Sequence, residues 1–193
     1  MVRRPAEQTR EHVLDVATEL FYRQGIRSTG VDVVARAADV APTTLYRVFG
    51  SKDGLVDAYL DRMAARYRQW FDLEVAAGAT PRDRLLLAVD GALAQVVAPD
   101  CLGCPFQRGL AELLDPQAPG HRRAQELKEW VRGRLGAITA ELPGVPPADA
   151  EVLADQVFLV VEGMYAAALA FRPVVPAQRA HALVEALVSA ATR

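Results

Sequence analysis

The chain has 193 residues, of which 51% are hydrophobic and 24% charged, an ordinary balance for a globular protein with one sizeable core or a small domain joined to a larger one. Its two cysteines exclude a disulfide framework, and no apolar segment follows the charged first ten residues, so we expect no secretory signal and a cytoplasmic location. The net charge of −2 is unfavourable for nucleic-acid binding until it is divided, because residues 1–52 carry eight Lys/Arg against six Asp/Glu.

Apolar residues recur at helical spacing along the whole chain, and no alternating strand pattern or internal repeat occurs. A first helix ends at Gly25. We expect further helices over residues 29–38, 42–50, 52–75, 81–97, 106–114, 120–142, 148–171 and 176–193. The predicted fold is all-α, with a small three-helix domain over residues 1–52 and a larger helical domain over residues 53–193.

Two short helices joined by a tight turn stand out in the first of these domains. The earlier of these two short helices can be capped by Ser28 or Thr29. It has one apolar stripe, which consists of Val31, Val34, Ala35 and Ala38. Residues 39–41 form the turn. Pro42 begins the second helix, where its missing N–H costs nothing. This pattern predicts a helix-turn-helix.

The second short helix directs polar side chains outward. Its inward positions are apolar and Gly50 ends it, which leaves an outward set of Thr43, Thr44, Tyr46 and Arg47. Ser51 then caps the next helix, whose first turn holds Lys52. A short polar helix held at a fixed angle by a small apolar core is what a protein needs to enter a DNA major groove. We therefore expect DNA binding.

The run from Val31 to Leu55 has the pattern A-x-x-A-x-V followed by T-L-Y-x-x-F-x-S-K-x-x-L, and it resembles the TetR/AcrR family of bacterial transcriptional regulators. The sequence departs from the family at Asp39, where Gly is usual, and at Val48, where Tyr or His is common, so Val48 receives no DNA role. The resemblance implies an N-terminal helix-turn-helix DNA-binding domain and a C-terminal helical domain for ligand binding and dimerisation. It further implies a homodimeric repressor that a small effector releases from a double-stranded DNA operator.

Six side chains are candidates for contact with DNA. Hydroxyl and guanidinium groups suit phosphate oxygens and base edges, and the N-terminus of a helix favours a phosphate, which together select Thr29, Thr43, Thr44, Tyr46, Arg47 and Lys52. The alternatives are an ordinary solvated face for the middle four, and simple capping for Thr29 and Lys52. Arg3 and Arg4 either reach a minor groove as an arm or add nonspecific attraction.

The predicted helix over residues 148–171 is apolar on almost every side and must be covered all round. A partner subunit is one cover, and the helix over residues 176–193 has a matching stripe. In the resembled family these two helices form a four-helix dimer interface; the alternative is the central helix of a monomer. Because Glu162 interrupts the most apolar stretch, we expect no transmembrane segment and no membrane partner.

Bulky side chains in the larger domain are candidates for an effector pocket, with plain core as the alternative: Trp70, Phe71, Phe106, Trp130, Phe158 and Tyr165. Glu162 joins them, because a carboxylate in an apolar helix needs a partner, either an arginine or a polar group of the ligand. These residues predict a mainly apolar effector with one or two polar groups.

Cys101 and Cys104 form a C-x-x-C motif. Structural zinc needs four ligands, and only His12, His121 and His181 could join the two cysteines, with His12 in the predicted DNA-binding helices. We therefore expect no metal, and nothing in the sequence calls for a cofactor. The alternative function is a thiol-based redox enzyme or a redox-switched regulator, since a thiol near a helix start has a lowered pKa. The third possibility is that both cysteines pack a loop. No catalytic constellation is visible, so we expect no enzyme.

Overall fold

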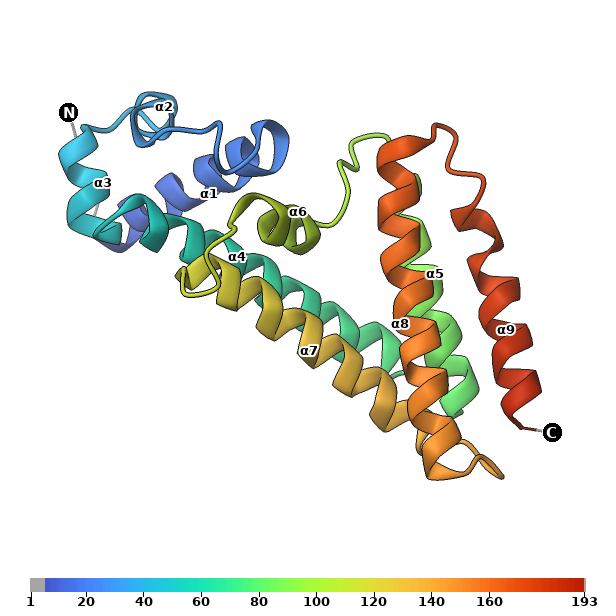
Figure 1. The fold of residues 1–193 in the computed structure, drawn as a ribbon. Helices are drawn as coiled ribbons and strands as arrows, with labels where there is room; N and C mark the ends of the chain where they lie inside the picture. Colours follow the sequence, from blue (N-terminus) through green and yellow to red (C-terminus); the bar gives the residue numbers. More distant parts are fainter. Residues whose placement is uncertain (1–5, 193) are drawn as a thin grey trace. The chain divides into compact units, whose positions relative to one another are not determined.

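The computed structural model describes residues 6–192, so Arg3 and Arg4 lie outside the described residues. Within that range the chain forms helices and no strand, which confirms the predicted all-α class (Figure 1). The helices are α1 Ala6–Gln24, α2 Val31–Ala37, α3 Pro42–Phe49, α4 Lys52–Trp70, α5 Pro81–Val97, α6 Pro105–Glu112, α7 Pro119–Thr139, α8 Pro147–Ala170 and α9 Ala180–Ala191. A π-helical turn, η1 Phe71–Val75, continues α4, and a 3₁₀ turn, η2 Ala177–Arg179, precedes α9.

Local sequence signals explain where several helices begin and end. Gly25 ends α1 at a φ of 94°, a conformation that glycine adopts without steric cost. At the start of α5 the Thr80 hydroxyl accepts a hydrogen bond from the Asp83 amide, and the Asp83 carboxylate accepts one from the Thr80 amide. This reciprocal capping box satisfies two amides that the helix itself leaves unpaired.

Contacts divide the chain into two compact units that do not coincide with residues 1–52 and 53–193. The first unit comprises Met1–Ala65 and Pro105–Glu126, and the second comprises Arg66–Cys104 and Leu127–Arg193. The reason is packing between elements distant in sequence. A side-chain carbon at Gly109 in α6 would lie 3.6 Å from Leu60 in α4, so α6 packs directly on that helix. Sequence periodicity contains no information about such a pairing.

The first unit has a small apolar core formed by α1, α2, α3, the start of α4, and α6. Phe21 and Tyr59 meet at its centre with ring centroids 5.5 Å apart. The other buried members include Val13, Leu14, Ala17, Val34, Ala35, Leu45, Leu55 and Leu60. Their burial fixes the angles of the two short helices, because each helix buries one stripe in the same core.

In the second unit α5, α8 and α9 lie side by side (Figure 1). Their shared core includes Leu85, Val89, Leu153, Val157, Val161, Val184 and Val188. The 24-residue α8 contains an 18-residue stretch with a mean hydropathy of 1.5, so it is long and apolar enough to cross a membrane by length and composition, contrary to the expectation from the sequence. In the structure one face of α8 packs on α5 and α9.

Candidate nucleic-acid interface

The turn between α2 and α3 is held by backbone contacts on both sides. The Val40 amide donates to the Ala35 carbonyl at 3.0 Å, and the His12 ring nitrogen Nε2 lies 2.9 Å from the Ala38 carbonyl oxygen. Asp39 has a φ of 52°, in the left-handed region that favours glycine, which Asp tolerates better than most residues. The turn therefore stays tight although position 39 is Asp and not Gly.

The α3 helix presents the predicted polar face. Leu45 is buried beneath it, Thr44 is half-buried, and Thr43, Tyr46 and Arg47 are exposed. Tyr46 is 53% exposed, so its ring and hydroxyl face solvent. The helix ends at Gly50 with a φ of 76°.

Two of the predicted contact residues serve first as structural groups. The Thr29 side chain is fully buried and its hydroxyl donates to the Gly25 carbonyl at 2.7 Å, while Gly30 rather than Ser28 or Thr29 occupies the N-cap of α2. The Thr29 hydroxyl therefore points into the loop, and a role of Thr29 at a DNA phosphate stays a prediction. Lys52 is half-buried, with its Nζ 3.5 Å from the Arg27 carbonyl oxygen.

The start of α4 follows the predicted capping. The Ser51 hydroxyl accepts a hydrogen bond from the Gly54 amide at 3.0 Å. Gly54 also lies against the end of α3, since a side-chain carbon there would be 2.1 Å from the Phe49 carbonyl oxygen. The junction between α3 and α4 is thus too close for any side chain at this position.

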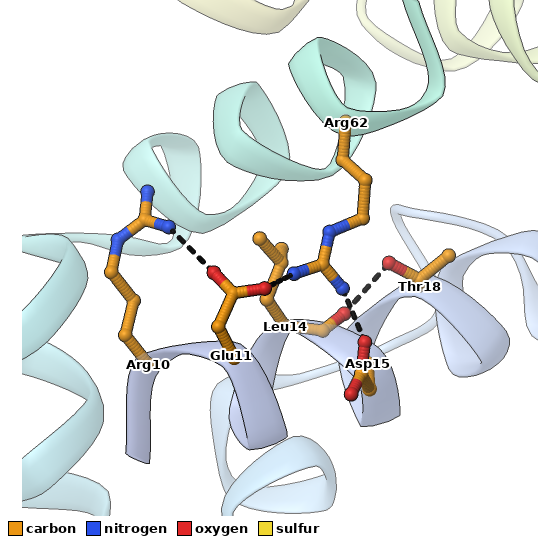
Figure 2. A network of polar contacts seen from close by, with 6 residues as sticks. All are labelled: Arg10, Glu11, Leu14, Asp15, Thr18 and Arg62. Atoms are coloured by element: carbon orange, nitrogen blue, oxygen red, sulfur yellow. Dashed lines mark hydrogen bonds and ion pairs between the residues drawn. The ribbon is translucent and has the colours of Figure 1, made fainter. Parts of the chain in front are cut away.

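Ion pairs tie α1 to α4 behind the short helices (Figure 2). The Arg62 guanidinium, only 13% exposed, donates to the Glu11 and Asp15 carboxylates, and Glu11 also pairs with Arg10. The Arg10 guanidinium lies over the Phe49 ring of α3, 5.3 Å from its centroid. This network joins α1, α3 and α4, so it fixes where α3 stands.

Sequence reasoning missed several residues at this face. Arg36 on α2 is exposed, and among the described residues neither it nor Arg47 is in an ion pair, so both guanidinium groups are available to phosphates. The loop before α2 is held from α6: the Arg27 amide donates to the Glu112 carboxylate at 2.8 Å, and Arg108 donates to the Tyr22 carbonyl. Partners so far apart in sequence leave no local signal.

The predicted pocket residues are brought together only in part. Trp70, Phe71 and Trp130 form one aromatic cluster with Tyr67, a residue the sequence analysis did not select. Phe106 is buried in α6 and belongs to the first unit, whereas the other six belong to the second.

The remaining three pocket candidates all lie on α8. The Phe158 side chain is half-buried, the Tyr165 hydroxyl donates to Gln95 at 2.8 Å, and Glu162 pairs with Lys128 rather than with an arginine. The structure also has a groove of about 570 Å³, which involves none of the seven candidates. It is lined by Gly144, Pro146, Asp149, Val152, Leu153, Gln156, Leu187, Ala190 and Ala191.

Both cysteines are free and buried in the loop before α6. The Cys101 sulfur accepts a hydrogen bond from the Gly103 amide at 3.4 Å, and the Cys104 sulfur accepts one from Lys128 at 3.3 Å. Within the described part of the chain, no group of three or more His, Cys, Asp or Glu side chains is placed to hold a metal ion. The two thiols pack and order this loop.

Comparison with known proteins places the helix-turn-helix in a defined family. Residues 13–59 match the family model described as bacterial regulatory proteins, tetR family. An HTH-type transcriptional regulator of Mycobacterium tuberculosis is 32% identical over 93 residues, covering 48% of this chain and 46% of that protein. The regulator TcmR of Streptomyces glaucescens is 31% identical over 156 residues, covering 74% of this chain and 63% of TcmR. This chain thus spans about half the length of the Mycobacterium tuberculosis relatives that it matches.

Solved structures extend the likeness to the whole fold. A TetR-family transcriptional regulator from Streptomyces coelicolor has a TM-score of 0.90 at 25% identity, over 97% of both chains. A TetR-type regulator from Streptomyces avermitilis has a TM-score of 0.81 at 28% identity, over 95% of this chain and 97% of the other. The chain belongs to the TetR family of bacterial transcriptional regulators.

In this TetR-family chain, the segment that matches the family model contains the candidate nucleic-acid interface. Residues 13–59 run from within α1 into α4 and include the whole of α2, the turn and α3. The relatives are named as transcriptional regulators, so the comparisons give no support to the thiol-based redox alternative.

Proposed function

We propose that this TetR-family chain is a DNA-binding transcriptional regulator and not an enzyme, a cytoplasmic homodimeric repressor that a small, mainly apolar effector releases from its operator. The observation that carries the proposal is the α3 face, where Thr43, Tyr46 and Arg47 stand exposed on a helix braced by α1 and α4. Exposed hydroxyl and guanidinium groups on a rigid helix suit the major groove.

In this proposal residues 1–52 form the DNA-binding domain and residues 53–193 the regulatory and dimerisation domain. Thr43, Thr44, Tyr46 and Arg47 contact the operator from α3, and Lys52 approaches a phosphate at the start of α4. Arg36 joins this set because its guanidinium is exposed. Thr29 contributes through the position of the loop, since its side chain is buried.

The dimer forms through α8 and α9 in this proposal. One face of α8 stays exposed although it is apolar or small at almost every position, and it consists of Val152, Gln156, Leu159, Gly163, Ala166 and Ala170. Leu183 on α9 is likewise 50% exposed. Nothing lies within 4 Å of the place where a side chain on Gly163 would begin. Small residues at this spacing let a second helix approach closely, and a two-fold axis presents two recognition helices to paired half-sites.

Release by an effector requires that it bind the DNA-free conformation better than the DNA-bound one. The proposed site is the second unit's share of the predicted pocket, namely Trp70, Phe71, Trp130, Phe158, Glu162 and Tyr165. Phe106 is left out because it belongs to the other unit. By linkage, operator DNA weakens the binding of the effector by the same factor as the effector weakens the binding of DNA.

The test is selection of bound duplexes from a random DNA pool with the full chain, followed by mobility-shift measurement of the enriched sequence at fixed salt. We expect a two-fold symmetric motif with half-site centres about one helical turn apart. The double variant Tyr46→Ala with Arg47→Ala is the matched control, and it should enrich nothing while keeping its helical circular dichroism. If wild type and control enrich the same sequences, or if no sequence is enriched, the proposal is wrong.

A further inference from the structure

A half-buried polar cluster lies within the second unit, and it belongs neither to the α3 face nor to the exposed apolar face of α8. Lys128 of α7 places its Nζ 2.5 Å from the Glu162 carboxylate of α8 and 3.3 Å from the Cys104 sulfur. The Lys128 and Glu162 side chains are 15% and 22% exposed. An ion pair removed this far from water loses much hydration energy, and apolar residues of similar size often stabilise a fold as well.

Two phenol groups lie near this pair, and one of them also belongs to the aromatic cluster. Burial, together with the negative potential of Cys104 and Glu162, raises the pKa of the Tyr67 and Tyr165 hydroxyls, so both stay neutral hydrogen-bonding groups. Tyr67 also belongs to the aromatic cluster, with its ring 5.4 Å from Trp70 and 6.4 Å from Trp130. These three rings are half-buried.

The charge balance of the cluster restricts what it binds. The Lys128 and Glu162 charges cancel, so an incoming ion would leave one buried charge without a counter-ion, at a high desolvation cost. Arg134 is 42% exposed and paired with Asp72, and the guanidinium groups of Arg134 and Arg68 each lie 5.7 Å from the centroid of the half-buried Trp130 ring. An uncharged ligand with an oxygen atom can accept a hydrogen bond from Lys128 and leaves the net charge of the Lys128–Glu162 pair at zero.

We propose that Lys128 and Glu162 are the polar recognition pair for the effector, and that this effector is an uncharged planar aromatic molecule with a carbonyl or hydroxyl oxygen. The ring packs against Tyr67, Trp70 and Trp130, and the oxygen accepts from Lys128. The effect of this ligand on operator binding rests on the proposed function, whereas binding of the ligand itself does not depend on DNA.

The position of Cys104 links ligand binding at Lys128 to α6. Cys104 directly precedes α6, whose Arg108 and Glu112 hold the Tyr22 carbonyl and the Arg27 amide in front of α2. A ligand oxygen that takes a Lys128 hydrogen bond from Cys104 loosens the anchor at the start of α6. The loop before α2 is then less firmly held, which disfavours the DNA-bound conformation.

Three naphthalene probes that differ in charge test the inference by isothermal titration calorimetry on the full chain at neutral pH. They are 2-acetylnaphthalene, 2-naphthoate and 2-naphthylmethylammonium. We expect the neutral ketone to bind at least about tenfold more tightly than either ion, because burying an unpaired charge costs more than that factor. Equal or tighter binding of an ion by the wild type, or no binding of any probe, overturns the inference.

Variants locate the effect at the pair. The double variant Lys128→Met with Glu162→Met removes both charges at nearly constant volume, so it should keep its fold and bind the ketone about tenfold more weakly. The variant Glu162→Gln leaves the Lys128 charge uncompensated, and its preference should move from the ketone to the carboxylate. Arg82→Gln, which removes one side of an exposed pair with Glu185, is the control and should change nothing. Unchanged ligand preference in Glu162→Gln contradicts the assignment.

Operator binding separates this inference from the proposed function. In mobility shifts the ketone should weaken the wild-type complex and leave the complex of the double Met variant unchanged. If the chain binds no operator while the charge series behaves as expected, the proposed function fails and the ligand site stands. If the operator binds but the ketone does not, the ligand site fails alone.

Discussion

At the scale of single residues, Tyr46 carries the strongest prediction for DNA binding. Replacing Tyr46 by Ala removes an exposed ring and hydroxyl from α3, and operator affinity should fall by about 1–3 kcal/mol. The loss should appear in mobility shifts at fixed salt with the circular dichroism spectrum unchanged. Gln69→Ala, an exposed change outside residues 13–59, is the control. Wild-type affinity in Tyr46→Ala would remove α3 from the interface.

Asp39 places a carboxylate in the turn that directly precedes α3. Asn tolerates the left-handed backbone at this position as well as Asp does, so Asp39→Asn changes the charge alone. We expect the operator affinity to rise about two- to fivefold at low salt, because a repulsion of the phosphates worth less than ~1 kcal/mol disappears. The gain should shrink as salt is added. An increase that is independent of salt would mean that the charge is not the cause.

Tyr67 and Tyr165 predict how stability depends on alkaline pH. Their pKa values are raised in the folded state, chiefly by burial, so the unfolded chain loses these protons at a lower pH than the folded chain. Their contribution is fully present below about pH 10 and is lost as pH rises from there. The variant Tyr67→Phe with Tyr165→Phe should show a flatter decline of the free energy of unfolding above pH 10, measured with urea. An equally steep decline would contradict this.

At the scale of elements, Gly54 tests the close junction of α3 and α4. Gly54→Ala places a carbon against the Phe49 carbonyl, which cannot move without shifting α3, so the free energy of unfolding should fall by about 1–3 kcal/mol. Gly133→Ala in α7 is the matched control, because nothing lies within 4 Å of its new carbon. It should stabilise the chain by roughly 0.5–1 kcal/mol. Urea denaturation gives both values, and a loss in both variants would remove the steric explanation.

At the scale of the whole molecule, the exposed face of α8 tests the proposed dimer. Leu159 is 66% exposed, and Leu159→Glu places a charge at the centre of that face. We expect sedimentation at micromolar concentration to show a dimer for wild type and a monomer for the variant, because a buried unpaired carboxylate opposes association. Leu73→Glu, at an equally exposed leucine in η1, should remain dimeric. A monomeric wild type would contradict the proposal.

Short-range patterns in the chain were enough to predict the fold class, the helices and the family. Each of these depends on neighbours within a few turns: the periodic apolar stripes, the Pro42 start, the Gly50 stop and the Ser51 cap all act over short range. The outward face of α3 was predictable for the same reason, since a single buried stripe fixes which side faces solvent.

The remaining features could not be predicted, because they depend on contacts between residues distant in sequence. Thr29 is fully buried and donates to the Gly25 carbonyl, in a loop whose Arg27 amide is bound by Glu112 of α6, and no local signal indicated this burial. Phe106 packs in the first unit because α6 lies against α4. Glu162 needed a partner by its chemistry alone, but the choice of Lys128 over an arginine depended on how α7 and α8 meet in space.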